Sequence, residues 1–429
     1  MVDPVNGRHG AFDLLIDAGR VADVRVPGSV SQADECIDAS GCYVTPGWID
    51  MHVHLREPGY EYKETVLTGA KAAVAGGFAA VACMANTSPV NDSGAVTHYI
   101  VERATAAELA RVYPIGAVSV DLKGERLAEF GEMHEAGIVA VSDDGRPVMD
   151  SALMRRALEY SRMFDIPVIA HEHDLALAGD GCMNEGPTAF RLGLRGIPAA
   201  AEEAMVARDL ALLERTGGRL HIAHVSTAGT VELVRRAKAR GLAVTAEVTP
   251  HHITLTEAAV AEYDTNAKMS PPLRLAADLE AMIAGLRDGT IDAIATDHAP
   301  HHADEKDVEF ECAADGIVGL ETALALCLAL LREHSLSVET LVRAVSVNPA
   351  RILGIPGGSL APGAVADVTV VDPQATWTVA PERFHSKSRN TPFGGWTLMG
   401  MARATLVGGQ VKWRAAEAAP ARRKRRAAP

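Results

Sequence analysis

The hydrophobic pattern of the chain changes its period repeatedly between residues 43 and 332. Short apolar runs alternate with stretches in which apolar side chains recur every three or four positions, as they do on one face of a helix. This alternation is typical of parallel strands that are joined by helices. The apolar runs predict eight strands, at residues 43–51, 77–84, 112–118, 137–142, 166–170, 219–223, 243–248 and 291–295.

The stretches between these strands predict helices, and the fold class is therefore α/β. Eight strands with intervening helices predict a closed (β/α)8 barrel of the TIM type. In that architecture the loops after the strands build the active site, so catalytic side chains lie at the C-terminal ends of the strands. The predicted helices include residues 61–75, 150–163, 199–215, 229–240 and 319–332.

Both ends of the chain carry a β-like alternation instead. Runs at 13–17 and 20–26 are matched near the other end by runs at 367–372 and 404–413, and no helical period appears in them. We expect the two ends to meet in one small β-sandwich domain. The expected organisation is residues 1–45 plus 355–413 for the β domain, residues 46–354 for the barrel and residues 414–429 for a disordered basic tail.

Composition narrows the classes of function. The net charge of −14 and the 4% content of aromatic residues argue against a nucleic-acid partner, which requires positive charge and stacking surfaces. No apolar stretch approaches the roughly 20 residues of a membrane span, and the start lacks the pattern of a secretory signal. The six cysteines form no CxxC pair and are expected to be reduced core residues. We therefore expect a soluble, cytoplasmic protein.

Side chains of the metal-ligand type appear abruptly at five of the predicted strand ends. Because residues i and i+2 of an extended chain point to the same side, a histidine pair with this spacing provides half of a metal site. The residues are His52 and His54 after the first strand, Asp143 and Asp144 after the fourth, His171, Glu172 and His173 after the fifth, His224 after the sixth and Asp297 after the eighth.

Taken singly, these residues have ordinary explanations, such as a hydrogen-bonded histidine at a barrel rim or an aspartate in a turn. Together they would converge at one mouth of the barrel. Four of these imidazoles (His52, His54, His171 and His224) and two carboxylates (Asp297 and one of the pair Asp143 and Asp144) already exceed the ligands of one tetrahedral zinc ion. They suit two divalent ions with a bridging carboxylate and a bridging hydroxide, which is hydrolytic chemistry because zinc lowers the pKa of bound water from 15.7 to about 7.

Seven motifs, in their order along the chain, resemble those of cyclic amidohydrolases, and most closely those of class I dihydroorotases. They are PGWIDMHVHLREPG (46–59), NTSP (86–89), SDDG (142–145), AHEHD (170–174), HVST (224–227), MSPPLR (269–274) and TDHAPH (296–301). The resemblance extends from about residue 40 to residue 400. It implies the reversible hydrolysis of (S)-dihydroorotate to N-carbamoyl-L-aspartate in de novo pyrimidine (UMP) biosynthesis.

The resemblance also implies the roles of the metal-ligand residues. His52, His54 and Asp297 would bind a first Zn²⁺, and His171 and His224 a second. Asp144 would be the bridging carboxylate, with Asp143 as the second choice. Hydantoinases place a carbamylated lysine there, whereas the nearest lysine of this chain, Lys123, follows strand three and is misplaced. Asp297 would act as general base and then as general acid.

The residues that the resemblance assigns to the substrate follow the same motifs. Arg56 is placed for a bidentate pair with the substrate carboxylate, with His54, Asn86 and His301 beside it, while Ser270 and the backbone of Asp315 and Gly316 would contact the ring. The chain departs from the family at Ser270, where relatives carry Asn, and at Asp315, where they often carry an aromatic residue or Pro-Phe. The start of the sequence, MVDPV (1–5), also resembles the end of a first strand and turn that relatives begin earlier.

Two other functions stay open at this point. One is a hydantoinase- or allantoinase-type cyclic amidase, against which Asp144 and Arg56 count. The other is an inactive scaffold homologue, which would be expected to have lost metal ligands. The resemblance further implies a homo-oligomer and names aspartate transcarbamoylase as a candidate partner. The acidic segment 302–314 is either a lid over the active site or a solvated loop.

Overall fold

Eight short parallel strands form a closed barrel at the centre of the computed structural model, which describes residues 1–30 and 33–416. Three strands form one ladder and five form another. Parallel bridges from Gly116 to Val141 and from Val53 to His298 join the two ladders into a barrel. The predicted (β/α)8 barrel is thereby confirmed. Its strands are β6 (Trp48–Val53), β7 (Phe78–Cys83), β8 (Arg111–Pro114), β9 (Val141–Ser142), β10 (Val168–Ala170), β13 (Leu220–Ile222), β14 (Val244–Val248) and β15 (Ala293–Ile294).

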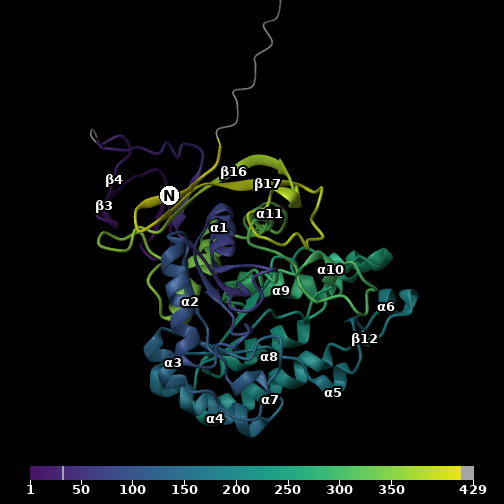
Figure 1. The fold of residues 1–429 in the computed structure, drawn as a ribbon. Helices are drawn as coiled ribbons and strands as arrows, with labels where there is room; N and C mark the ends of the chain where they lie inside the picture. Colours follow the sequence, from purple (N-terminus) through teal and green to yellow (C-terminus); the bar gives the residue numbers. More distant parts are fainter. Residues whose placement is uncertain (31–32, 417–429) are drawn as a thin grey trace, which may run out of the picture.

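Helices surround the barrel because each turns an apolar face toward the strands (Figure 1). In α4, for example, Leu153, Met154, Ala157 and Leu158 are buried while the intervening arginines are exposed. The main helices are α1 (Val66–Gly76), α2 (Gly94–Ala107), α3 (Phe130–Ala136), α4 (Ser151–Ser161), α7 (Ala200–Thr216), α8 (Ala228–Ala239), α9 (Ala276–Asp288), α11 (Ala323–Glu333), α12 (Val338–Val342) and α13 (Asn348–Leu353).

The first predicted strand, 43–51, is wrong as a single element. Tyr43–Pro46 forms β5, which pairs with the strand β16 outside the barrel, and Trp48–Val53 forms β6 within it. The chain changes sheets at Gly47, where an added Cβ would lie 2.6 Å from Cβ of Ala79. Pro46 precedes this point and has no N–H group to offer to a ladder. The predicted helix 61–75 likewise begins later, at Val66, because Thr65 caps it.

A second group of strands combines the two ends of the chain. In Figure 1 the purple N-terminal strands and the yellow C-terminal strands lie together above the barrel. The hairpin of β3 (Asp13–Asp17) and β4 (Arg20–Arg25) shares an apolar core with a four-stranded sheet in the order β18-β17-β16-β5. The sheet contains β16 (Val368–Thr378), β17 (Thr397–Val407) and β18 (Gln410–Arg414). The domain boundaries 1–45 plus 355–413 and 46–354 stay a prediction, and residues 417–429 of the expected tail lie outside the described residues.

Among the described residues, none of the helices combines the length and the apolar character needed to cross a membrane. All six cysteines are free, as expected. Cys36 and Cys312 are exposed, however, and do not lie in the core as the sequence analysis expected.

The remaining elements are short. They are β1 (Val2–Asp3), β2 (Arg8–His9), β11 (Met183–Asn184), β12 (Gly196–Ile197), α5 (Leu175–Ala178), α6 (Pro187–Leu192), α10 (Ala303–Lys306), the 3₁₀ turns Val120–Leu122, Arg162–Phe164, Glu257–Tyr263, Thr265–Ala267 and Pro381–Arg383, and the π-helical turn Arg343–Val347.

Candidate metal centre and active site

The carboxylate of Asp144 lies within 3.4 Å of all four candidate histidine ligands. Its Oδ1 is 3.3 Å from Nε2 of His52, 3.3 Å from Nε2 of His224 and 3.4 Å from Nδ1 of His171. Its Oδ2 is 3.4 Å from Nε2 of His54. Asp144 therefore occupies the position that a bridging ligand between two cations requires.

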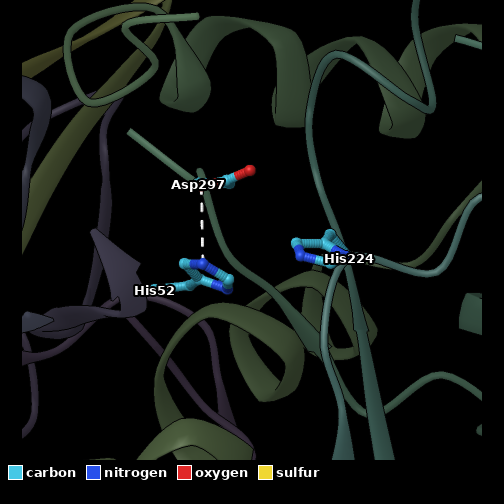
Figure 2. Close-up of side chains that lie close together, drawn as sticks. All are labelled: His52, His224 and Asp297. Atoms are coloured by element: carbon cyan, nitrogen blue, oxygen red, sulfur yellow. Dashed lines mark ion pairs between the residues drawn. The ribbon is translucent and has the colours of Figure 1, made fainter. Parts of the chain in front are cut away.

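Asp297, which follows β15, completes the cluster. Its Oδ1 lies 3.0 Å from Nε2 of His54 and 3.4 Å from Nε2 of His52. Figure 2 shows His52, His224 and Asp297 facing one another across the mouth of the barrel. Three overlapping sets have ligand atoms within 4.8 Å of one another and could each hold a metal ion: His52, His224 and Asp297; His52, His54 and Asp144; and Asp144, His171 and His224.

The neighbouring Asp143 points away from this cluster. Its Oδ1 accepts hydrogen bonds from the backbone N–H groups of Val118 (2.8 Å) and Ser119 (2.9 Å), and its Oδ2 accepts from the Ser119 hydroxyl. Burial raises the pKa of Asp143 to about 6. Adjacent residues of an extended segment point to opposite sides. The structure thus places Asp144, and not Asp143, among the histidines.

The electrostatics of the cluster suit a cation. All six candidate ligands are buried. Burial alone would raise the pKa of Asp144, but the charge of His52 and hydrogen bonds from His171 and His224 hold that pKa well below its usual value. Burial would likewise lower the pKa of His52, and the carboxylates of Asp144, Asp297 and Glu247 raise it well above its usual value. In the absence of a cation these carboxylates favour a protonated His52, and a metal ion would take the place of the proton on its buried Nε2, which has no hydrogen-bond partner among the described residues.

Glu247, on β14, was missed by the sequence analysis. Its Oε1 lies 2.6 Å from Nδ1 of His52 and accepts a 3.4 Å hydrogen bond from the backbone N–H of His224. Its Oε2 lies 3.2 Å from Nε2 of His221. Such a carboxylate behind a ligating histidine fixes the orientation and tautomer of the imidazole. The signal was available, since Glu247 is an acidic residue in an otherwise apolar strand end, Ala246-Glu247-Val248.

Three functional residues have left-handed backbone conformations. The φ angles are 62° at Arg56, 30° at His224 and 45° at Asp297. Positive φ is uncommon for residues other than glycine and persists where the surrounding structure enforces it, as it often does at active sites.

Asn86 contacts His54, and Arg56 contacts His301. Nε of Arg56 donates to the carbonyl oxygen of Pro300 (3.2 Å), and one of its terminal nitrogens lies 3.4 Å from Nε2 of His301. Oδ1 of Asn86 lies 2.8 Å from Nδ1 of His54. Burial and the positive charge of Arg56 lower the pKa of His301 to about 3, so its imidazole is neutral at physiological pH.

Ser270 and Asp315 line a cavity of about 480 Å³ next to the cluster, together with His173 and Lys268. The ring centroid of His173 lies 6.1 Å from that of His171, so the cavity lies beside one of the candidate metal ligands. Gly316 has a φ of +156°, and an added Cβ would lie 2.7 Å from the carbonyl oxygen of Ala299. The structure thus brings the six candidate metal ligands together in one cluster, whereas Asp143 and Glu172 lie outside it, and the individual roles of all these residues stay predictions.

Comparisons with known proteins identify the family. Residues 41–230 match the family model of dihydro-orotase-like proteins, and residues 188–412 match that of the amidohydrolase family. A dihydroorotase from Anaeromyxobacter sp. (strain K) is 59% identical over 413 residues, covering 96% of this chain and 95% of the relative. A dihydroorotase from Syntrophotalea carbinolica is 56% identical over 414 residues, covering 96% of this chain and 97% of the relative.

Solved structures support the fold. An L-hydantoinase (dihydropyrimidinase) from Arthrobacter aurescens superposes with a TM-score of 0.84 at 24% identity, covering 96% of this chain and 93% of that one. A dihydropyrimidinase from Brevibacillus agri NCHU1002 gives a TM-score of 0.82 at 22% identity, with the same coverage of the two chains. At these identities the likeness concerns the barrel and its β layer. The full-length sequence identities go further, and the chain belongs to the dihydroorotase family of the amidohydrolases.

Proposed function

We propose that this chain is a dihydroorotase, which interconverts (S)-dihydroorotate and N-carbamoyl-L-aspartate and closes the ring in the direction of pyrimidine synthesis. The observation that carries the proposal is the position of Asp144, which four imidazoles from three other strands approach within 3.4 Å. A carboxylate in that position would be able to hold two cations at once. The family membership makes a cyclic amide the substrate class.

The proposed centre holds two Zn²⁺ ions. His52, His54 and Asp297 would bind the first ion, His171 and His224 the second, and Asp144 both. When bound, such a pair lowers the pKa of water and polarises the carbonyl of the substrate. The lowered pKa values of Asp144 and Asp297 support this assignment, because they keep both carboxylates ionised, which is the form that binds metal.

Asp297 is the proposed proton carrier. In the hydrolytic direction its carboxylate accepts a proton from the attacking water as the oxygen forms a bond to the ring carbonyl carbon. It then delivers that proton to the ring nitrogen as the carbon–nitrogen bond breaks, acting as general base and then as general acid. Ring closure uses the same atoms in reverse. A pKa held low by His52 and His54, against the effect of burial, keeps the carboxylate ionised and able to accept the proton.

The substrate is held at two ends in this proposal. Arg56, Asn86 and His301 bind its carboxylate, where the buried guanidinium offers paired donors. Ser270 and the backbone of Asp315 and Gly316 contact the ring. The Ser270 hydroxyl can replace one hydrogen bond of the Asn found in relatives, but it cannot supply both a donor and an acceptor at the reach of an amide.

Other assignments have weaker support. A hydantoinase-type activity would place a carbamylated lysine at the end of the fourth strand, where this chain has Asp144. A scaffold homologue without activity would not be expected to keep all six ligand positions. Self-association and association with aspartate transcarbamoylase belong to the proposal as further predictions, as does a cytoplasmic location.

The test combines a measurement of metal content with an assay of N-carbamoyl-L-aspartate cyclisation on the purified protein. We expect two bound divalent ions per chain, loss of activity on chelation and its return with Zn²⁺. Full activity without bound cations would contradict the metal assignment. Faster turnover of a cyclic amide that lacks a carboxylate would favour the hydantoinase alternative.

A further inference from the structure

Two buried lysines hold the backbone of segment 311–316, which includes Asp315 and Gly316. Their side chains come from different places in the sequence, Lys268 from the stretch after β14 and Lys306 from the end of α10. Each ammonium group donates to two carbonyl oxygens of the segment. The bonds run from Lys268 to Glu311 (3.0 Å) and Ala313 (2.7 Å), and from Lys306 to Ala314 (2.7 Å) and Gly316 (3.1 Å).

These ammonium groups are unusual in their partners. Lys268 and Lys306 are only 5% and 6% exposed, and buried lysines are normally paired with carboxylates. Within the described residues, the one carboxylate in ion-pair range is Asp315, whose Oδ1 lies 4.0 Å from Nζ of Lys268. Backbone carbonyls therefore supply most of the solvation of the two charges. Burial lowers the pKa of Lys306 to about 8, in agreement with this environment.

The held segment is also tied to the carboxylate-binding side of the proposed site. The N–H of Gly316 donates to the carbonyl oxygen of Lys268 (3.0 Å). The carbonyl of Gly316 accepts a second bond, from Nδ2 of Asn390 (3.0 Å), and Oδ1 of Asn390 accepts from the backbone N–H of His301 (3.1 Å). One connected set of bonds thus runs from the two lysines through Gly316 and Asn390 to His301.

This arrangement restricts the peptide planes of the segment. Four of its carbonyl groups are directed at two fixed ammonium groups, so rotation of a peptide plane would break a hydrogen bond to a charged donor. Lys268 lines the same cavity as Ser270 and Asp315. The segment that borders this cavity at Glu311 and Asp315 is therefore held in one orientation by the two ammonium groups.

We propose that Lys268 and Lys306 are positioning residues for substrate binding, which fix segment 311–316 so that the backbone of Asp315 meets the cyclic amide in one orientation. The proposal rests on the proposed function, because it takes the ring to be the group that this backbone contacts. The lysines themselves touch neither the candidate metal ligands nor the reacting atoms. Their removal is expected to weaken substrate binding and to leave the metal centre intact.

The test uses Lys306→Met and Lys268→Met, which keep a side chain of similar length but remove all donors. Lys123→Met is the matched control, because Lys123 is exposed and its one ion pair within the described part of the chain is with Asp121. For each single variant we expect KM for N-carbamoyl-L-aspartate to rise about tenfold or more, the loss that corresponds to one or two hydrogen bonds. We expect kcat to fall less than KM rises, the metal content to stay at the wild-type value, and amide exchange in 311–316 to accelerate. The control should match the wild type in all four measurements.

Lys306→Gln provides a second variant if the methionine variants fold poorly. Its amide keeps an N–H donor without the charge, and its KM should lie between those of the wild type and Lys306→Met. An unchanged KM despite faster exchange would overturn the positioning role and leave a structural one. Unchanged amide exchange in 311–316 would show that the lysines do not hold this backbone. This readout remains valid even if the wild type shows no dihydroorotase activity.

Discussion

The Oε1 atom of Glu247 lies 2.6 Å from Nδ1 of His52, on the side of the imidazole away from Asp144 and Asp297. In the neutral, metal-binding form of His52, Nδ1 is therefore the nitrogen that carries the proton, and Nε2 has the lone pair for a cation. The second oxygen of the carboxylate, Oε2, faces His221. Oε1 also accepts a hydrogen bond from the backbone N–H of His224. Glu247 thus acts on residues that belong to both halves of the proposed two-ion centre.

Glu247→Gln should weaken metal binding without removing a metal ligand. The amide has nearly the same shape, but it no longer attracts the proton of His52 with a full negative charge, so the tautomer and orientation of the imidazole are less well fixed. Changes of this kind typically reduce metal affinity 10–100-fold. Titration of the metal-free protein against a competing chelator measures the effect. Glu232→Gln is the control, because Glu232 is a half-buried residue of α8 whose carboxylate pairs with Arg235 and Arg236 and not with a histidine of the cluster. Equal affinities in the two variants would show that Glu247 does not orient His52.

Asp144→Asn and Asp143→Asn form a second test, in which adjacent residues should behave differently. Asp144→Asn replaces the carboxylate that four imidazoles approach with an uncharged amide. We expect this variant to lose at least one of the two proposed ions and nearly all activity. Asp143→Asn keeps an oxygen that can accept from the N–H groups of Val118 and Ser119, so it should keep both ions. Elemental analysis of the two purified variants decides between them. Retention of both ions by Asp144→Asn would refute the bridging role.

Much of the barrel could be predicted from local pattern alone. Each buried parallel strand is a short apolar run, and an abrupt polar residue marks its end, as His171 does after β10 and His224 after β13. The error at 43–51 arose because an apolar run does not show which sheet the strand joins. The break at Pro46-Gly47 became meaningful only when β16, more than 300 residues later in the chain, was seen to pair with β5.

The parts of the site that the sequence analysis missed depend on contacts between distant segments. Glu247 and His221 stand out as polar residues within apolar strands, so their importance could have been inferred. Lys268 and Lys306 carry no such signal, because lysine in a polar stretch normally points into solvent. Their burial follows from the way segment 311–316 folds back over both of them, which no local pattern specifies.

Acid should destabilise the protein partly through His252. Burial lowers the pKa of this imidazole well below its usual value, while Nε2 donates to the carbonyl oxygen of Pro271 (3.0 Å) and Nδ1 accepts from the hydroxyl of Thr249 (2.8 Å). Below about pH 6.5 the unfolded chain binds a proton at His252 that the folded chain does not. The free energy of unfolding therefore falls as pH falls, by about 1.4 kcal/mol per pH unit from this group.

Urea unfolding of the metal-free protein at pH 7.5 and pH 5.5 measures this contribution. His252→Gln keeps a donor and an acceptor but cannot titrate, so it should lose about 1.4 kcal/mol less than the wild type between the two pH values. His98→Gln removes an exposed imidazole of α2 and should behave like the wild type. A pH dependence in His252→Gln equal to that of the wild type would show that the imidazole does not stay neutral in the fold.

Arg56→Lys should raise KM for N-carbamoyl-L-aspartate with little change in metal content. The guanidinium donates through Nε to Pro300 and presents its terminal nitrogens beside His301, a geometry that a lysine ammonium cannot reproduce. Loss of a charge-assisted hydrogen bond corresponds to about 1.5–3 kcal/mol, or roughly 10–150-fold in KM. Steady-state kinetics with Arg155→Lys, an exposed arginine of α4, as control tests this. An unchanged KM would remove Arg56 from the proposed carboxylate site.

Asp297→Asn should separate proton transfer from metal binding. The amide oxygen can still approach the first ion beside His52 and His54, so much of the metal should remain, but the amide cannot accept a proton from water or deliver one to the ring nitrogen. Because general acid–base catalysis contributes about 10²–10⁴-fold, kcat should fall by at least that factor. Asp292→Asn is the matched control: this aspartate lies just before the other end of β15, where it pairs with Lys238 (2.5 Å), so its loss should lower stability and leave kcat unchanged. Near-normal turnover in Asp297→Asn would assign the proton to another group, and loss of all metal would mean that Asp297 serves first as a ligand.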